Sequence, residues 1–395
     1  MMTSFNFPIR RSQTVRDVAS LNVVLLTNFI PPHQRPAYEE LSRRVGKLTL
    51  LLSTHMEADR EWDVRWGDLD VRVQRTLSLR RPRKHPLNFD QQIEVHIPWD
   101  TLGQLRRLKP DVVISDELGF RSLFCAGRRI LHPATRLVVC GNLSEHTEQG
   151  RGQVRRLLRR RLVRFADCVT YNGSSGAEYL RRLGTSPERM AHVPYCPAPE
   201  ALYRGPFRQT SPNETRLLYV GHFNQLKGIV PFTQALARWA RANTERVITF
   251  SLVGAGPLEK ELASLSTPDN LTVELLGTQP IETLPSFYAN ADMFAFPSLA
   301  DEWGLVVNEA LHAGLPVVGS TFSQAVLDLI DDQVTGWKYR PDCDNAMEQA
   351  IRRALDTSTE KLSEMRSSCR ERVCGITPSF VADRLVDAIT VTQTH

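Results

Sequence analysis

The chain alternates short, continuous apolar runs with longer segments in which apolar residues recur at helical spacing. This alternation is typical of βαβ units, whose parallel strands are buried on both faces. The pattern therefore predicts a parallel sheet in the first half of the chain. Its predicted strands are Asn22–Thr27, Lys47–Ser53, Val71–Thr76, Val112–Ser115, Leu137–Cys140 and Cys168–Tyr171, and its predicted helices include Pro36–Arg44 and Trp99–Leu108.

A second series of the same kind fills the second half of the chain. Between the two series, the proline-rich segment Val193–Asn213 is typical of an interdomain linker. Two doubly wound sheets joined in this way face each other across a cleft at the carboxyl ends of their strands, where such folds bind ligands. The second series has predicted strands at Arg216–Val220, Val247–Val253, Leu271–Leu275, Met293–Pro297 and Pro316–Gly319, and predicted helices at Pro231–Ala242 and Leu305–Ala313.

Composition narrows the class of protein. The 395 residues are 42% apolar and 24% charged with a net charge of +5, which is an ordinary globular balance. The seven cysteines have no CxxC spacing, which argues against a disulfide framework or a zinc site and favours a reducing cytosol. Residues 1–20 lack the apolar core of a signal peptide, and no apolar run approaches the length of a membrane span. We therefore expect a cytoplasmic protein that could still lie on the inner face of a membrane.

The most informative segments follow predicted strands of the second series. After Arg216–Val220, the chain continues through Gly221 and His222 to Lys227 at the start of a predicted helix. A glycine lets the backbone approach a ligand, and a helix N-terminus with a lysine favours an anion. The alternative interpretation is an ordinary turn with a solvated lysine.

A similar turn follows the next strand and contains Gly254, Gly256 and Pro257. It lacks the third glycine of a dinucleotide-binding fingerprint, so on its own it is a weak indication of a ligand.

An acidic loop follows the predicted strand Met293–Pro297. Asp301 lies in this loop, and Glu309 lies about two helical turns further along the next helix. Two carboxylates placed in this way could bind hydroxyls on either side of a ligand, while the first amides of the helix could hold a phosphate. For Glu302, the favoured interpretation is an acidic cap that stabilises the helix dipole. The other candidates at this helix start are Trp303, Gly304, Leu305 and Val306.

These segments, in this order, resemble the C-terminal domain of the GT-B retaining glycosyltransferases of family four, the glycosyl transferases group 1. That family has a V-G-x-G-P turn, an A-D-x-F-x-x-P-S strand, and an E-x(7)-E segment that continues as E-A-x-A-x-G-x-P-V-V. The chain carries Val253–Pro257, Ala291–Ser298 and Glu309–Val318 at the corresponding places. The resemblance implies a GT-B fold, with two Rossmann-like domains across a cleft, and a transferase that uses a nucleotide sugar.

The resemblance also implies a role for each matching residue. Lys227 should hold the donor diphosphate, Glu309 the ribose hydroxyls and Asp301, as a catalytic candidate, the transferred sugar. The amides of residues 304–306 should contact the sugar and the phosphate. His222 stands where the family has a phosphate-binding arginine, and Asp301 replaces a glutamate. A neutral imidazole supplies less charge than a guanidinium, and aspartate is one methylene shorter than glutamate.

The implied reaction transfers a sugar, with retention, from a UDP- or GDP-linked donor to a hydroxyl of a glycan or lipid-linked acceptor in cell-surface polysaccharide synthesis. Neither a metal nor a cofactor is implied. In GT-B relatives the last helix returns to the first domain. The expected division is a tail at 1–20, an acceptor-side domain at 21–196 completed by helix 378–391, a linker at 197–213, and a nucleotide-sugar-binding domain at 214–374.

The N-terminal domain offers acceptor-side candidates in two loops. Asn28, His33 and Arg35 lie in a proline-rich loop after the first predicted strand, although this loop could simply be a stiff turn that caps a helix. Glu145 and His146 follow the strand Leu137–Cys140, where the family supplies a catalytic or acceptor-side residue. We expect Glu145 first and His146 second to bind or help deprotonate the acceptor hydroxyl. The alternative is that both residues cap the helix that follows.

That helix, Gln153–Phe165, combines an apolar stripe with many arginines and contains no acidic residue to neutralise them. It could pack its stripe on the sheet with solvated arginines, or it could face an anionic membrane. The stripe is Val154, Leu157, Leu158, Leu162 and Phe165, and the arginines are Arg155, Arg156, Arg159, Arg160, Arg161 and Arg164.

Two other classes of function compete with sugar transfer. The basic charge is compatible with a nucleic-acid-binding protein, but the chain has no recognition motif or interleaved aromatic residues, so we expect no nucleic-acid partner. A nucleotide-sugar epimerase or a phosphorylase would share the architecture. Because a fold does not determine a function, the family motifs rather than the sheets favour transfer.

Overall fold

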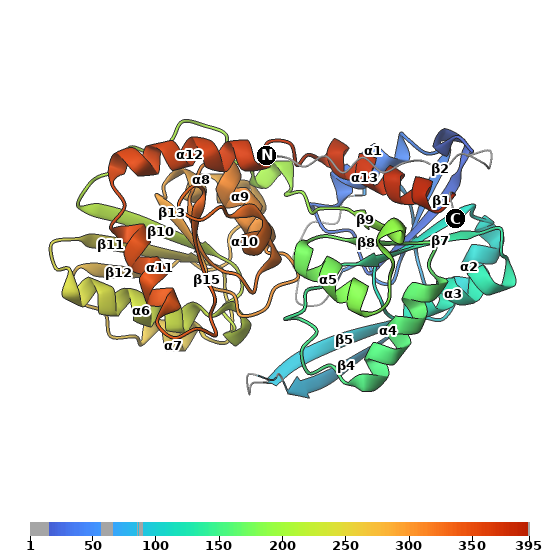
Figure 1. The fold of residues 1–395 in the computed structure, drawn as a ribbon, viewed down its shortest axis with the longest axis horizontal. Helices are drawn as coiled ribbons and strands as arrows, with labels where there is room; N and C mark the ends of the chain where they lie inside the picture. The colour runs from blue at the N-terminus through green and yellow to red at the C-terminus, as the bar shows by residue number, and fades with distance from the viewer. Residues whose placement is uncertain (1–15, 57–65, 85, 87–89, 394–395) are drawn as a thin grey trace.

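The computed structural model describes residues 16–56, 66–84, 86 and 90–393, so most of the expected tail at 1–20 lies outside the described residues. Two parallel sheets, each covered by helices on both faces, lie side by side (Figure 1). The first sheet has seven strands in the order β3-β2-β1-β6-β7-β8-β9. Their bounds are β1 Asn22–Thr27, β2 Lys47–Leu52, β3 Asp70–Val73, β6 Val112–Ser115, β7 Arg136–Gly141, β8 Cys168–Tyr171 and β9 Met190–His192.

The strand side chains alternate between two layers of helices. Val23 and Leu25 of β1 pack with α1 and α13, whereas Val24 and Leu26 pack with α2 to α5 on the opposite face. Because both faces are covered, the strands are nearly all apolar rather than alternating. These helices are α1 Arg35–Ser42, α2 Thr101–Leu108, α3 Phe120–Leu131, α4 Gln153–Phe165, α5 Ser174–Arg182 and α13 Pro378–Val391.

The second sheet has six parallel strands in the order β12-β11-β10-β13-β14-β15. Helices α6, α7 and α11 pack on one face, and α8, α9 and α10 pack on the other. The strands are β10 Glu214–Val220, β11 Val247–Val253, β12 Leu271–Leu275, β13 Met293–Phe296, β14 Val317–Ser320 and β15 Gly336–Tyr339. The helices are α6 Ile229–Ala242, α7 Glu259–Ala263, α8 Leu284–Ala289, α9 Leu305–His312, α10 Gln324–Leu329, α11 Ala346–Leu355 and α12 Thr359–Val373.

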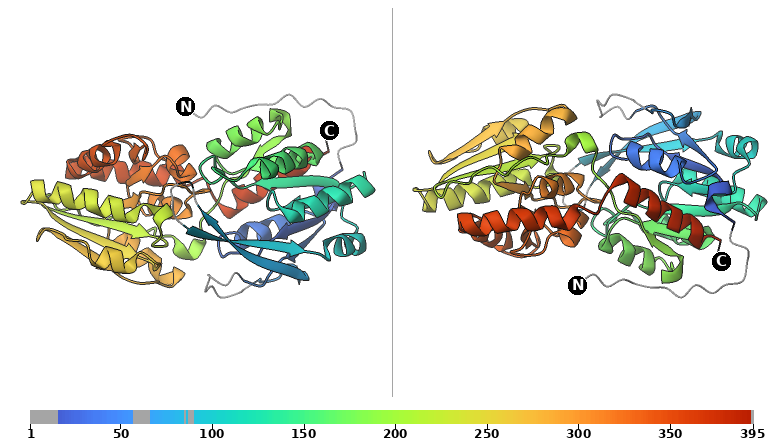
Figure 2. Two further views of the ribbon diagram at one scale, coloured as in Figure 1. Left: turned by 90° about the horizontal axis from the view of Figure 1, so that it is seen from below. Right: turned by 90° about the horizontal axis from the view of Figure 1, so that it is seen from above.

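The chain returns to the first domain at its end. After α12, Thr377 caps α13 by accepting a hydrogen bond from the Phe380 amide at 3.2 Å. Leu385 and Ile389 of α13 are then buried in the core of the first sheet, beside α1. Figure 2, in its view from above, shows α13 and α1 side by side.

These two sheets confirm the predicted fold class. The prediction of a strand at Val71–Thr76 is wrong at its end, because β3 stops at Val73 and an antiparallel hairpin begins at Thr76. The hairpin, β4 Thr76–Lys84 and β5 Asp90–Pro98, forms a separate two-stranded sheet. Strand β4 was not predicted because it contains Pro82 and several basic residues, although an edge strand tolerates proline. Figure 2 shows the hairpin in front in the view from below.

The strand orders reverse at β1 and β6 in the first sheet and at β10 and β13 in the second. Loops at the carboxyl ends of strands at such a switch point form the ligand-binding crevice of doubly wound folds. The loops that follow β10 and β13 carry the sharpest sequence motifs. The fold therefore places these motifs together.

Candidate functional site

The loops after β10 and β13 meet through an ion pair. Lys227 ends the short 3-10 turn Gln225–Lys227, and its Nζ pairs with the carboxylate of Asp301. The ammonium also lies 5.7 Å from the centre of the Phe296 ring at the end of β13. The structure thus brings together the two side chains that the sequence assigned to the diphosphate and to the sugar.

Glycine makes this close approach possible. Gly228 has a φ of 62°, and a Cβ at this position would lie 2.3 Å from the carbonyl oxygen of Pro297. Only a residue without a side chain fits there, because the backbone is left-handed and the neighbouring atom is itself backbone. The position next to Lys227 therefore sets the spacing of the two loops.

The turns after β10 and β11 also touch. The Gly221 amide donates to the carbonyl of Val253 at 3.0 Å, and a Cβ on Gly254 would lie 2.0 Å from the Gly221 oxygen. The glycine at 254 is thus required by contact between the turns. Gly256 is half-buried and Pro257 exposed beside this contact, and His222 is exposed at the carboxyl end of β10.

Glu309 lies on α9 and is buried. The Tyr288 hydroxyl donates to its Oε2 at 2.7 Å. Burial raises the pKa of Glu309 to about 7, and the hydrogen bond from Tyr288 opposes that rise. In its ionised form this carboxylate can accept hydrogen bonds from the hydroxyls of a ligand. Tyr288 was not predicted, and its only sequence signal is its place just before the motif at Ala291.

The start of α9 is held by its neighbours. Gly304 is the N-cap, with no side-chain cap, and Leu305 and Val306 at the helix start are half-buried. Trp303 is buried, and its indole nitrogen donates to Asn308 at 2.7 Å, so its side chain stabilises the loop from within. The first amides of α9 lie beside Asp301, where a helix N-terminus favours an anion.

The interpretation of Glu302 as a helix cap is wrong. The cap is Gly304, and the carbonyl of Glu302 instead accepts hydrogen bonds from Asn172 of the first domain and from Gln324. Glu302 is exposed to solvent, yet nearby protein desolvates its carboxylate and raises its pKa to about 7; Arg151 opposes the rise, and Asp301 adds to it. The loop therefore faces the N-terminal domain.

On the opposite side of the cleft, Asp116 follows β6 directly. It accepts hydrogen bonds from Thr27 at 2.9 Å and Asn142 at 2.6 Å, and burial raises its pKa. Asn28 accepts a hydrogen bond at 2.6 Å from the buried Arg121. Asp116 was missed, although a polar residue at the end of a central strand is a usable signal.

His33 and Arg35 lie at the start of α1. His33 packs edge-on against Tyr195 with ring centres 5.6 Å apart, and both line a hollow of about 50 Å³. That volume holds water but no sugar ring. Arg35 pairs with Glu200 at 3.3 Å and with Glu39 at 3.6 Å.

Glu145 and His146 point in different directions. Glu145 pairs with Arg182 of α5 at 2.5 Å. The imidazole of His146 stacks on Phe322 of the second domain with ring centres 3.6 Å apart, and burial lowers its pKa. The Asp301 amide donates to the Phe322 carbonyl at 3.3 Å. Of the two acceptor-side candidates, His146 therefore lies next to the loop after β13.

Among the described residues, no group of three His, Cys, Asp or Glu side chains could hold a metal ion. No helix in that part of the chain is both long and apolar enough to cross a membrane.

Two glycosyltransferase families match the chain. Residues 22–196 match the glycosyl transferase 4-like domain, and residues 214–357 match the glycosyl transferases group 1. The alpha-D-kanosaminyltransferase of Streptomyces kanamyceticus is 30% identical over 144 residues, 35% of this chain and 36% of its own. The amylovoran biosynthesis glycosyltransferase AmsK of Erwinia amylovora is 33% identical over 96 residues, 22% of this chain and 23% of its own. The match thus spans about a third or less of these relatives.

Solved structures share the fold over nearly the whole chain. Sucrose-phosphate synthase from Thermosynechococcus elongatus has a TM-score of 0.67 at 18% identity, covering 93% of this chain and 98% of that one. Anabaena HepE in complex with UDP-glucose has a TM-score of 0.65 at 16% identity, covering 93% and 99%. At these identities the likeness shows the fold. With both domains matched in order and both sheets in place, the chain belongs to the glycosyl transferases group 1, the family-four glycosyltransferases of GT-B fold.

Proposed function

We propose that the protein transfers a sugar from a nucleoside-diphosphate donor to a hydroxyl acceptor. The observation that carries this proposal is the ion pair of Lys227 with Asp301 just before the N-terminus of α9, the helix that also carries the buried Glu309. A cation and helix amides suit a diphosphate, and carboxylates on either side suit the hydroxyls of a sugar and a ribose. UDP is the first nucleotide to test, because HepE of the same fold was solved with UDP-glucose, and GDP is the second.

Each residue has a distinct part in the proposed reaction. Lys227 has three N–H donors, so it can contact the donor diphosphate while it still holds Asp301. Asp301 then accepts hydrogen bonds from hydroxyls of the transferred sugar, and Glu309 accepts hydrogen bonds from the ribose hydroxyls. As the sugar leaves, negative charge grows on the diphosphate, where Lys227 and the amides of residues 304–306 stabilise it.

The acceptor enters from the N-terminal side of the cleft, where His146 and Asp116 lie. We propose a hydroxyl of a glycan or lipid-linked acceptor, with retention at the anomeric carbon, as the resemblance implies. The name of AmsK supports polysaccharide synthesis as the setting. The reduced cysteines, all seven of them free, suit a cytoplasmic site of action.

Proton NMR of donor hydrolysis tests the proposal without a known acceptor, because water can react slowly in place of the acceptor hydroxyl. UDP-, GDP- and ADP-sugars are incubated separately with the protein. The anomer of the released sugar is identified before the sugar mutarotates. We expect one donor to be hydrolysed and an α-linked sugar to appear first as its α-anomer.

Two variants assign the activity to the site. Lys227→Ala and Asp301→Asn should each lower the hydrolysis rate roughly a hundredfold, since both lose charge stabilisation in the transition state. Lys260→Ala, at an exposed lysine of the same domain, should leave the rate unchanged. Absence of hydrolysis for every donor, or equal rates in all variants, would refute the proposal.

A further inference from the structure

Helix α4 does not follow the first of its two predicted alternatives, in which its apolar stripe packs on the sheet. Val154 is 75% exposed, Leu157 55% and Leu158 46%, while Arg159 on the inner side is 5% exposed. Of the predicted stripe, only Leu162 is buried. Val163, outside the stripe, is also buried. A soluble helix normally shows the reverse pattern.

The buried arginine is explained by Glu148, an acid just before the helix. Its carboxylate pairs with Arg159, with Arg151 at 3.3 Å and with Arg155 at 3.9 Å. The acidic partner of the inward arginines therefore comes from outside the helix, which itself contains no acidic residue. An ion-pair cluster inside and leucines outside make physical sense if the outer face does not meet water.

The exposed apolar surface continues onto neighbouring helices. Among the described residues, eleven of the fourteen exposed large apolar side chains lie between Leu77 and Phe165. Ile130 of α3 and Phe165 of α4 line one hollow of about 490 Å³, so the two helices share this surface. The exposed apolar residues of α2, α3 and α4, which we call the α2–α4 surface, are Leu102, Phe120, Leu123, Ile130, Leu131, Val154, Leu157, Leu158 and Phe165.

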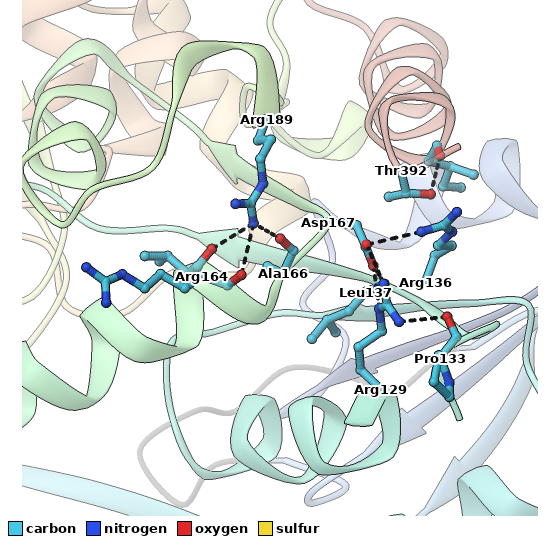
Figure 3. A network of polar contacts seen from close by, with 11 residues as sticks. Arg129, Pro133, Arg136, Leu137, Arg164, Ala166, Asp167, Arg189 and Thr392 are labelled. Carbon is cyan, nitrogen blue, oxygen red and sulfur yellow. Dashed lines mark hydrogen bonds and ion pairs between the residues drawn. The ribbon is translucent and has the colours of Figure 1, made fainter. Parts of the chain in front are cut away.

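Polar contacts hold this surface rigidly (Figure 3). Arg129 of α3 donates two hydrogen bonds of 3.0 Å to the carboxylate of Asp167, which lies just beyond the end of α4. Arg189 caps α4 by donating to the carbonyls of Val163, Arg164 and Ala166. The Arg164 side chain points away from this network.

The helices of the α2–α4 surface are basic, although Asp167 and the exposed Glu188 line the hollow beside Ile130 and Phe165. Helices α2, α3 and α4 contain no acidic residue. The outward arginines of α4 form no ion pair with any residue that the structure describes, unlike the inward ones. These outward arginines are Arg156, Arg160, Arg161 and Arg164.

We propose that the α2–α4 surface docks on the anionic leaflet of a lipid bilayer. Its large exposed apolar side chains suit the acyl boundary of a bilayer, and the outward arginines of α4, which pair with none of the described residues, suit the negative headgroups. A second copy of the chain would cover the apolar residues but would bring the same outward arginines of α4 against each other. Helix α4 begins directly after the loop with His146, so a bilayer-held acceptor would lie near the cleft.

Vesicle co-sedimentation of the full chain tests this proposal independently of sugar transfer. Wild type should pellet with vesicles of phosphatidylcholine and phosphatidylglycerol at about 50 mM salt, and much less with phosphatidylcholine alone. Replacing Arg156, Arg160 and Arg161 by glutamine should lower the partition coefficient at least roughly tenfold. Replacing Val154, Leu157 and Leu158 by serine should also lower it and should leave residual binding salt-sensitive.

Matched controls carry the same changes elsewhere. Arg241, Lys260 and Arg352 replaced by glutamine, and Val247 and Val334 by serine, change exposed residues of the second domain and should bind as wild type does. Circular dichroism verifies folding. Wild type that stays in the supernatant with anionic vesicles, or surface variants that bind equally well, would overturn the proposal. So would a wild-type dimer that the serine variant converts to a monomer.

Discussion

At the scale of single residues, the proposed ribose role makes donor binding depend on the protonation of Glu309. Its pKa is raised to about 7 because the carboxyl is buried, so near neutral pH both forms are populated. Ribose hydroxyls donate to the carboxylate form. Donor binding should therefore favour the ionised form and release a proton.

We expect the donor affinity to be highest well above pH 7 and to fall as the pH drops through 7. Between pH 8 and pH 6 the fraction of ionised Glu309 falls roughly tenfold, so Kd should rise by about that factor. A nucleotide sugar suits this measurement because its diphosphate gains no proton in this range. Titration calorimetry at several pH values gives Kd directly.

Glu309→Gln should bind the donor more weakly and lose this pH dependence. Glu302→Gln is the matched control, because the pKa of Glu302 is also raised to about 7 in the cleft. If Glu302→Gln abolished the dependence while Glu309→Gln kept it, the ribose role would belong elsewhere.

At the scale of elements, Gly228 fixes the distance between the loops after β10 and β13. Gly228→Ala must hold a Cβ at positive φ against the Pro297 carbonyl. We expect a loss of stability of at least about 1 kcal/mol from the backbone alone, and weaker donor binding as Lys227 and Asp301 separate.

Thermal unfolding and nucleotide titration check this expectation. Gly127→Ala is the matched control, because Gly127 lies within α3 and a Cβ added there would meet no other atom within 4 Å. That change should keep stability or raise it, as alanine favours helix. An unperturbed Gly228→Ala protein would show that the loop spacing does not depend on this residue.

The elements themselves were largely predictable. The strands Val112–Ser115, Cys168–Tyr171 and Val247–Val253 have the predicted bounds, because buried parallel strands are continuous apolar runs. Helix α4 also has its predicted bounds, but the sequence left its orientation open between two alternatives. Periodicity shows that a helix has two faces, but the Glu148 cluster decides which one turns inward.

At the scale of the whole molecule, Gln324 joins the two domains. Its Nε2 donates to the Leu143 carbonyl at 2.9 Å and to Asn172 at 3.1 Å, and its Oε1 accepts from the Gly176 amide at 2.8 Å. No sequence pattern indicated this contact, because it joins segments far apart in the chain. The same holds for the stacking of His146 on Phe322.

Gln324→Met keeps the side-chain length but leaves buried polar groups of the first domain unpaired. Each such group costs about 1–3 kcal/mol, so we expect the domains to part more easily. Small-angle X-ray scattering should show a larger radius of gyration, with a lower Tm. Gln349→Met, at an exposed site on α11, should change neither. An unchanged radius and Tm in Gln324→Met would contradict the role of this contact.

The central claim is that a nucleoside diphosphate binds beside Lys227 and Glu309. Titration calorimetry of UDP, GDP and ADP against the wild type and Glu309→Gln tests it most directly. We expect one of these nucleotides to bind the wild type, and we expect Glu309→Gln to bind it at least about tenfold more weakly while remaining folded. Failure of all three to bind the wild type, or equal affinity in the two proteins, would contradict the account.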